Sequence, residues 1–360
     1  MRSVTWDMNS TQAETISDEV YFRSEPWCDY ISNSKLNLVD PSLGGSIELF
    51  ERSFQSKRRS KGFQMGTIVH TLILQSPDYG VSDMVKPSGK LGEITYTVFK
   101  LRSQDPKMTI AEAIAMSVKV NDYYKGKPSE NILKKAMKEG LPYYRHLRLW
   151  REKEYILTSQ EVETTLGCIT SLQTNEKIRN LIFPKAPVLS FNEHAMSVDV
   201  QLDDRTYTVK IKIDSWTIDV DKQIVVLNDL KTSGVGLHNF VNGYWETYPT
   251  DTDTIRIFHP GSFQKYKYYR QLALYAKVLS LYVEKNFGFK PTIIINIVAV
   301  ETRAPYLSRI FNFGIFDKGT FSQNQLKVGY EDLIELLWLL KDNNYEPKFS
   351  GVSQQPCAFI

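Results

Sequence analysis

Two carboxylates and one amine stand at strand-like spacing near the middle of the chain. Asp214 ends an alternating run that starts at Tyr207. Asp229 and Lys231 close a second run that starts at Ile224. If the two runs pair as neighbouring strands, the three charged groups can meet on one side of a sheet. Carboxylate oxygens suit Mg²⁺, and a lysine beside them could steer or activate a water, or stabilise charge in phosphodiester cleavage. The alternative is an ordinary hairpin with a solvated charged face.

Predicted strands and helices surround these two runs. The segment between them, Asp-Val-Asp-Lys-Gln at 219–223, is turn-like and favours a β-hairpin. Another alternating strand is expected over 189–200. A β-branched run at 292–300 predicts a strand covered on both faces, with an antiparallel neighbour at 307–316. Helices are expected over 62–75, 110–124, 130–138, 159–183, 266–282 and 323–340. The sequence therefore predicts a chain that mixes strands with amphipathic helices.

Length, charge and cysteine content limit the class of protein. The 360 residues suffice for one large domain or two modest ones, and 42% hydrophobic residues are typical of a globular chain. A net charge of +3 does not by itself indicate a nucleic-acid-binding protein. A basic groove would require lysines and arginines to cluster locally. The three cysteines are far apart and indicate no disulfide framework. With no apolar leader and no membrane-length apolar run, an intracellular, reduced protein is expected.

Three further features have both a functional and a structural interpretation. The basic cluster 57–61, Lys-Arg-Arg-Ser-Lys, could contact phosphate or could be a solvated loop. Gly66 and His70 share one face of the first predicted helix, where a histidine beside an apolar stripe is usually structural. The glycine indicates close approach to another element. Gln271 and Tyr275 also share a helix face, which could equally be a surface packed on the core.

Four ordered motifs resemble those of one nuclease family. They are Met65-Gly-Thr-Ile-Val-His70, Lys212-Ile-Asp214, Asp229-Leu-Lys231 and Tyr266-Lys-Tyr-Tyr-Arg-Gln-Leu-Ala-Leu-Tyr275. The RecB-like branch of the PD-(D/E)XK nucleases shows a G-x-x-x-H helix, a strand ending in Asp, a D-x-K strand and a Y-x-Y-x-x-Q-x-x-x-Y helix. Each motif alone is weak. As an ordered set they resemble this branch, and most closely the exonuclease VIII (RecE) catalytic domain.

The resemblance implies an α/β (α+β) fold of the PD-(D/E)XK type, in which helices flank a central mixed sheet. It also implies roles for individual residues. Asp214 and Asp229 would be metal ligands, and the carbonyl of Leu230 would be a third. Lys231 would assist the attacking water. His70 would bind a second metal or hydrogen-bond to the first site.

Three other positions receive roles by the same resemblance. Gln271 and Tyr275 would shape the substrate side of the site. Glu193 lies where some relatives carry an acidic residue, which makes it a further candidate metal ligand. One departure is Asn228, which stands before the D-x-K motif where an apolar residue is usual.

The implied activity is that of a Mg²⁺-dependent deoxyribonuclease, with Mn²⁺ able to substitute. Relatives act as exonucleases on duplex ends, so we expect 5′ to 3′ degradation that leaves single-stranded DNA for recombination or repair. Two alternatives stay open: a structure-specific endonuclease, and a non-catalytic DNA-binding protein with the same fold. No P-loop is present, which argues against ATP hydrolysis by that route. An iron–sulfur cluster of the kind some relatives carry is not expected, because Cys357 stands alone near the C-terminus.

The resemblance also suggests domain limits, location and partners. We expect an N-terminal arm over 1–29, one nuclease domain over 30–345 and a tail over 346–360. Two insertions are expected within the domain, a helical one at 88–140 and a loop at 232–265. A cytoplasmic protein is expected, in the host cytoplasm if the chain is phage-encoded. Duplex DNA ends, a single-strand annealing protein or recombinase, and copies of the chain in a ring are the expected partners.

Overall fold

A computed structural model of the chain describes residues 2–54, 61–75, 80–82, 84–126, 130–148, 154–249 and 254–345. The chain forms two compact units: Met1–His70 together with Cys168–Ile360, and the intervening Thr71–Gly167. Residues 57–60 of the basic cluster and the tail 346–360 lie outside the described residues. Among the helices of the described ranges, none is long and apolar enough to span a membrane.

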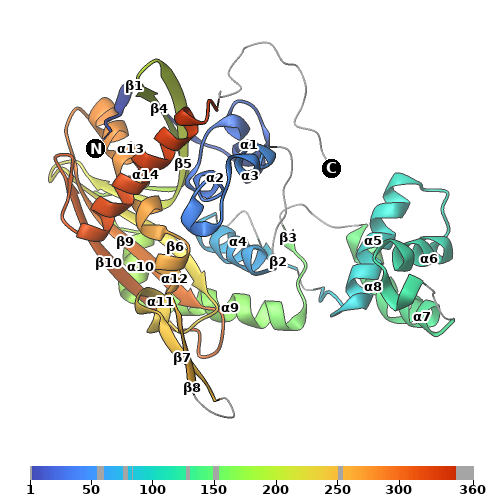
Figure 1. The fold of residues 1–360 in the computed structure, drawn as a ribbon. Helices are drawn as coiled ribbons and strands as arrows, with labels where there is room; N and C mark the ends of the chain where they lie inside the picture. The colour runs from blue at the N-terminus through green and yellow to red at the C-terminus, as the bar shows by residue number, and fades with distance from the viewer. Residues whose placement is uncertain are drawn as a thin grey trace. The chain divides into compact units, whose positions relative to one another are not determined.

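A seven-stranded mixed sheet forms the centre of the first unit (Figure 1). Its strands lie in the order β1 (Thr5–Thr15), β4 (Leu189–Leu202), β5 (Arg205–Asp219), β6 (Ile224–Ser233), β9 (Thr292–Glu301), β10 (Ser308–Asp317) and β11 (Thr320–Phe321). Neighbouring strands are antiparallel, except that β6 and β9 run parallel. Helices flank this sheet, which confirms the expected mixed α/β fold.

Most of the predicted helices of this unit are present with shifted ends. They are α4 (Lys61–Leu74), α13 (Tyr268–Phe287) and α14 (Asn324–Asp342). The helix expected over 159–183 is instead two helices, α9 (Ser159–Thr174) and α10 (Glu176–Ile182). The break has a local cause, because the side chain of Asn175 accepts a hydrogen bond from the backbone N–H of Ile178 and so caps α10. The longest of these helices, α13, packs against β1, β4, β5 and β9.

The N-terminal segment is more ordered than its polar sequence suggests. Strand β1 pairs with β4, and five short helical segments follow it: α1 (Asp18–Arg23), η1 (Trp27–Asp29), α2 (Asn33–Leu36), η2 (Pro41–Leu43) and α3 (Ile47–Arg52). Lys210 on β5 is only 2% exposed, and its ammonium donates to the carbonyls of Tyr21 and Trp27, each at 2.6 Å. The alternative of a solvated charged face on this hairpin is therefore wrong, because α1 and η1 cover it.

The segment expected as a loop insertion, 232–265, contains regular structure. Its first residues complete β6, and they are followed by α11 (Asn239–Asn242), β7 (Tyr244–Pro249), β8 (Thr254–His259) and α12 (Ser262–Lys265). Strands β7 and β8 form a separate antiparallel sheet of two strands. The chain then enters α13 at Tyr268.

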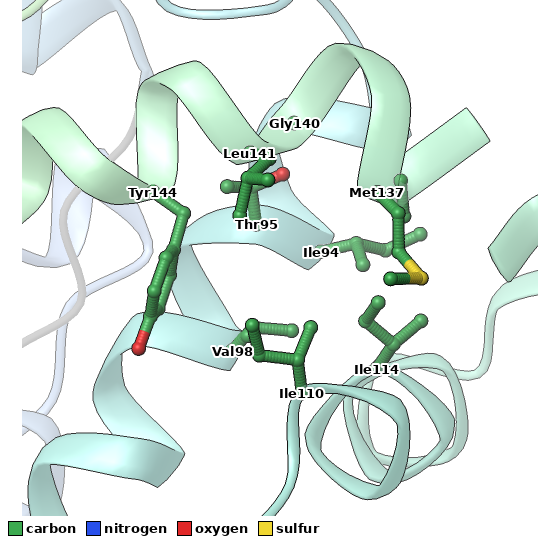
Figure 2. Close-up of a pocket in the computed structure, with 10 residues that line it drawn as sticks. Ile94, Thr95, Val98, Ile110, Ile114, Met137, Gly140, Leu141 and Tyr144 are labelled. Atoms are coloured by element: carbon green, nitrogen blue, oxygen red, sulfur yellow. The ribbon is translucent and has the colours of Figure 1, made fainter. Parts of the chain in front are cut away.

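The second unit, Thr71–Gly167, is mainly helical. It contains α5 (Lys90–Gln104), α6 (Ile110–Val120), η3 (Tyr123–Gly126), α7 (Glu130–Lys135), the π-helical turn η4 (Ala136–Gly140) and α8 (Leu141–Leu147). Strands β2 (Gly80–Val81) and β3 (Glu154–Tyr155) pair in parallel. A small gap in the apolar interior is lined by side chains such as Ile94, Ile114 and Tyr144 (Figure 2). The helices expected over 110–124 and 130–138 are the middle part of this bundle.

Candidate active site

The candidate site lies where β5 and β6 stop pairing with each other. The register of the two strands runs from Asp219↔Ile224 to Ser215↔Asn228 and ends there. The next residues are Asp214 on β5 and Asp229 on β6, and from this point β6 continues its pairing with β9. The carboxylate Oδ2 of Asp214 accepts a hydrogen bond from the backbone N–H of Leu230 at 2.6 Å. A side chain thus replaces the missing backbone partner, which fixes one aspartate beside the other.

Three potential metal-binding side chains converge at this point. One ligand atom each from His70 on α4, Glu193 on β4 and Asp214 on β5 lie within 4.8 Å of one another. Nδ1 of His70 is 3.6 Å from Oδ1 of Asp214. These three residues are far apart in the sequence, so the fold alone brings them together.

Glu193 occupies an unusual backbone position. Its neighbours pair across to β5 as Asn192↔Ser215 and His194↔Ile213, which places Glu193 opposite Asp214. Its φ of 52° lies in the left-handed region that costs most non-glycine residues energy. Such a conformation persists only where surrounding contacts maintain it. Here the strand departs from regular geometry at the residue whose carboxylate joins the cluster.

A glycine allows α4 to approach the sheet closely enough to deliver His70. A Cβ at Gly66 would lie 3.0 Å from Oγ1 of Thr232 on β6, tighter than an ordinary van der Waals contact. A larger side chain would require the hydroxyl of Thr232, or the helix itself, to shift. Because Gly66 and His70 are one helical turn apart, this contact sets the position of the imidazole.

The D-x-K strand and α13 form the other side of the site. Nζ of Lys231 is 2.6 Å from Oδ2 of Asp229, which is buried with the rest of the aspartate. The amide of Gln271 donates to Oδ1 of Asp229 at 3.0 Å and also lies 3.0 Å from the hydroxyl of Tyr275. The ammonium of Lys231 lies 5.1 Å from the ring centroid of Tyr268. Gln271 and Tyr275 therefore belong to the site through Asp229. Tyr268, the second tyrosine of the Y-x-Y motif, is an aromatic neighbour to which the sequence assigned no role.

The pKa of each titratable side chain at the site depends on its burial and on the charges of its neighbours. Burial raises the pKa of Asp229 to about 6, with Lys231 opposing this change and Asp214 adding to it. Burial would also raise the pKa of Asp214, but His70 outweighs it and the pKa is lowered. Burial would lower the pKa of His70, yet Asp214 holds it above its usual value. Burial raises the pKa of Glu193. Several carboxyl groups thus lie close together in a buried site, and nearby positive charge is needed to stabilise their ionised forms.

The charge state of Lys231 decides what it can do. Burial would lower its pKa, but the carboxylates of Asp229 and Asp214 raise it well above its usual value. The side chain is therefore an ammonium ion and is suited to orienting a water or stabilising negative charge. Both of these tasks use the protonated amine as a hydrogen-bond donor or a fixed positive charge.

A second buried lysine, Lys212, was not among the residues predicted for the site. Its ammonium is 2.5 Å from Oε2 of Glu193 and 2.7 Å from Oδ1 of Asp18 on α1. Burial opposes its protonated form, but Glu193 and Asp18 raise its pKa. Lys212 thus balances the charge of Glu193 and ties the N-terminal segment to the site. Its position two residues before Asp214 on one strand face was the only signal in the sequence.

Buried polar networks hold the strand and helix that carry the site. Arg270, beside Gln271 and with no exposed surface, donates to Asp40 at 2.7 Å and to Asp332 at 3.2 Å. It therefore anchors the first turn of α13. Asn228, the departure from the family pattern, accepts a hydrogen bond from Asn296 on β9, which in turn accepts one from Asn312 on β10.

The residues at the site fit a divalent metal ion. The cluster offers carboxylate oxygens, which are the ligands that Mg²⁺ and Mn²⁺ prefer, and one imidazole nitrogen, a ligand more typical of softer transition metals. Oδ2 of Asp229 is buried and, among the described residues, accepts no hydrogen bond of normal geometry besides its ion pair with Lys231. Leu230 contributes its N–H to Asp214, and the role expected for its carbonyl stays a prediction.

Comparisons with known proteins leave the family of the chain open. No family model matches the sequence, and no curated protein matches it. Among solved structures, the chain is similar to a protein described as a candidate exonuclease from Eubacterium rectale. The two share 13% sequence identity with a TM-score of 0.45, over 95% of this chain and 96% of the other. Similarity at this level carries no argument about activity, which must come from the site itself.

Proposed function

We propose that this chain is a divalent-metal-dependent nuclease that hydrolyses DNA phosphodiesters. The observation that carries the proposal is the joint placement of two groups. His70, Glu193 and Asp214 present ligand atoms within 4.8 Å of one another. Beside them, the buried carboxylate of Asp229 pairs with the ammonium of Lys231. In metal-assisted phosphodiester hydrolysis, carboxylates hold the metal, and an adjoining cation stabilises the negative charge that develops on the phosphate.

Each residue has a separate task in this proposal. Asp214 and Asp229 would hold the ion, with His70 and Glu193 available to it or to a second ion. When bound, Mg²⁺ or Mn²⁺ supplies Lewis acidity toward the phosphate and a water of lowered pKa. The ammonium of Lys231 stabilises the negative charge that develops on the phosphate oxygens. Hydrogen bonding from Gln271 keeps the carboxylate of Asp229 in a fixed orientation.

The form of nuclease that we propose is an exonuclease that acts 5′ to 3′ on duplex ends. It rests on the four ordered motifs and on the site that those motifs build. The test is digestion of end-labelled linear duplex and of covalently closed circular DNA with Mg²⁺, Mn²⁺ or a chelator. We expect linear DNA to be shortened from its 5′ ends, closed circles to survive, and the chelator to stop the reaction.

Controls make the test specific to this site. Asp214→Asn should be inactive, whereas Asp219→Asn, near the turn of the same hairpin, should retain activity. Rapid nicking of closed circles would favour the endonuclease alternative. If pure, folded protein cleaves neither DNA with either metal, the nuclease proposal is wrong.

A further inference from the structure

The hairpin formed by β7 and β8 exposes an unusual number of large side chains. Trp245 is 57% exposed and Phe258 is 47% exposed, although both belong to residue types that proteins usually bury. The hairpin extends away from the central sheet in Figure 1. The two chain segments approach closely where the hairpin begins, since a Cβ at Gly243 would lie 2.3 Å from the carbonyl oxygen of His259. The side chains are presented on a paired, two-stranded element.

The register of the hairpin separates two chemically different faces. Trp245 lies opposite Phe258 and Thr247 lies opposite Arg256, so these four side chains share one face. We call this the aromatic face. The rings of Trp245 and Phe258 have centroids 5.2 Å apart. The guanidinium of Arg256 lies 5.1 Å from the centroid of the Trp245 ring. An aromatic pair with a stacked guanidinium thus forms one continuous surface.

The chemistry of this face favours nucleobases over a protein partner. Its two remaining described positions are Pro249 and Thr254, so no carboxylate stands at its described positions. The opposite face holds two exposed tyrosines, Tyr244 and Tyr248, together with Ile255, Ile257 and the ion pair between Glu246 and His259, so it differs from the aromatic face by its aliphatic residues and its carboxylate. Aromatic rings with arginine are the groups on which unpaired bases stack, and at the described positions of this face no carboxylate would repel the phosphates.

The chain connects the hairpin at both ends to elements that carry the candidate site. Before it come β6, which carries Lys231, and α11; after it come α12 and α13, whose first residue, Tyr268, is the aromatic neighbour of that lysine. The connection into α13 contains Tyr266, which is 47% exposed, and the ammonium of Lys265 lies 5.5 Å from its ring centroid. The aromatic and cationic character of the hairpin thus continues along the chain toward the site.

We propose that the aromatic face binds the unpaired bases of a DNA strand whose backbone reaches the candidate active site. This inference rests on the proposed nuclease function and specifies its substrate as DNA with a single-stranded portion. Trp245 and Phe258 would stack on bases, and Arg256 would add a cation near the strand. Because every base has a stacking face, the binding would not depend on sequence.

Binding can be measured without cleavage by fluorescence anisotropy in a chelator at fixed salt. The probes are a labelled oligothymidylate and a strand of equal length whose bases are replaced by abasic tetrahydrofuran units. Both strands carry the same phosphates, so their difference reports base contacts alone. The variants are Trp245→Ala, Phe258→Ala and the ring-preserving Trp245→Phe. Ile257→Ala is the matched control, because it removes a side chain that is 45% exposed on the opposite face.

We expect wild type to bind the oligothymidylate more tightly than the abasic strand by about tenfold or more. Trp245→Ala and Phe258→Ala should each remove most of this difference without changing abasic binding. Trp245→Phe and Ile257→Ala should preserve it. Equal affinities of wild type and both alanine variants for oligothymidylate would overturn the proposal. It would also be overturned if these variants only converted an oligomer to a monomer in light scattering, since the face would then bind a second copy.

The outcome can be separated from that of the nuclease proposal. If wild type shows base-dependent binding through the aromatic face but no metal-dependent cleavage, the binding surface stands and the nuclease proposal fails. If wild type cleaves DNA and the alanine variants bind and cleave as it does, the nuclease proposal stands and this inference fails. Thermal melts of each variant check that the fold is intact.

Discussion

Replacement of Asp229 by asparagine should make the protein more stable in the absence of metal. The carboxylate is fully buried, and burial raises its pKa from 3.8 to about 6. The folded state therefore holds the proton more tightly than the unfolded state. Ionisation therefore lowers the free energy of unfolding. This loss is absent below the pKa of the unfolded state and reaches its full size once the pH exceeds the pKa of the folded state. Asparagine keeps an oxygen that can accept the hydrogen bond from Gln271 but carries no charge to bury.

The size of the effect follows from the two pKa values. Each tenfold difference in proton affinity corresponds to about 1.4 kcal/mol, so the ionised carboxylate costs up to about 3 kcal/mol above about pH 7. We expect Asp229→Asn to raise the Tm by several degrees at about pH 8 in a chelator, at roughly 2–4 °C per kcal/mol. The gain should shrink as the pH falls toward about 4, where aspartate itself is neutral in both states.

The assay is thermal unfolding followed by circular dichroism across this pH range. Asp219→Asn is the control, because hydrogen bonds from Lys222 lower the pKa of Asp219 and its neutralisation should lower stability instead. Added Mg²⁺ or Mn²⁺ should raise the Tm of wild type and have little effect on Asp229→Asn. If Asp229→Asn were no more stable than wild type at about pH 8, or equally stabilised at every pH, the electrostatic reasoning would be refuted.

Three further predictions concern the residues around Asp229. Asp214→Asn should abolish cleavage and lower the Tm, because His70 holds the pKa of Asp214 below its usual value; a gain in Tm would contradict this. His70→Gln should strongly reduce cleavage and should lower the Tm more at about pH 6 than at about pH 9, since a raised histidine pKa stabilises only while the ring is protonated. Lys212→Met should cost about 3–5 kcal/mol in urea unfolding, because Glu193 is left buried without its partner. A second substitution, Glu193→Gln, should recover part of that loss, and no recovery would argue against this pairing.

The meeting of Asp214, Asp229 and Lys231 could be predicted because it depends on local rules. Alternation sets which side chains share a face, and a short turn sets which strands pair. The position of His70 depends on how α4 packs, so helical spacing indicated only a glycine one turn away, and the expectation that His70 joins the site came from the family resemblance. The structure brings these residues together as expected, while their roles in catalysis stay predictions.

Other features could not be predicted because distant parts of the chain determine them. Lys212 looked like a solvent-facing strand residue, and only the packing of Asp18 beside it makes it a buried partner of Glu193. Strand β1 carries mostly polar residues, because it is an edge strand of which one residue, Thr11, is buried. The sequence predicts a loop where β7 and β8 form a hairpin, because both faces of the hairpin carry apolar side chains and the alternation that identifies a strand is lost.

The first unit is built from two separate parts of the sequence, Met1–His70 and Cys168–Ile360, and this affects the order in which the protein folds. Strand β1 pairs with β4, so Thr5 and Gln201 must come together although the whole of Thr71–Gly167 lies between them in the sequence. Closing so long a loop is slow and entropically costly. The second unit has local helical contacts, and its β2–β3 pair joins Gly80 to Glu154. If this unit forms first, it shortens the effective loop, and His70 can then reach the strands that a ribosome completes more than a hundred residues later.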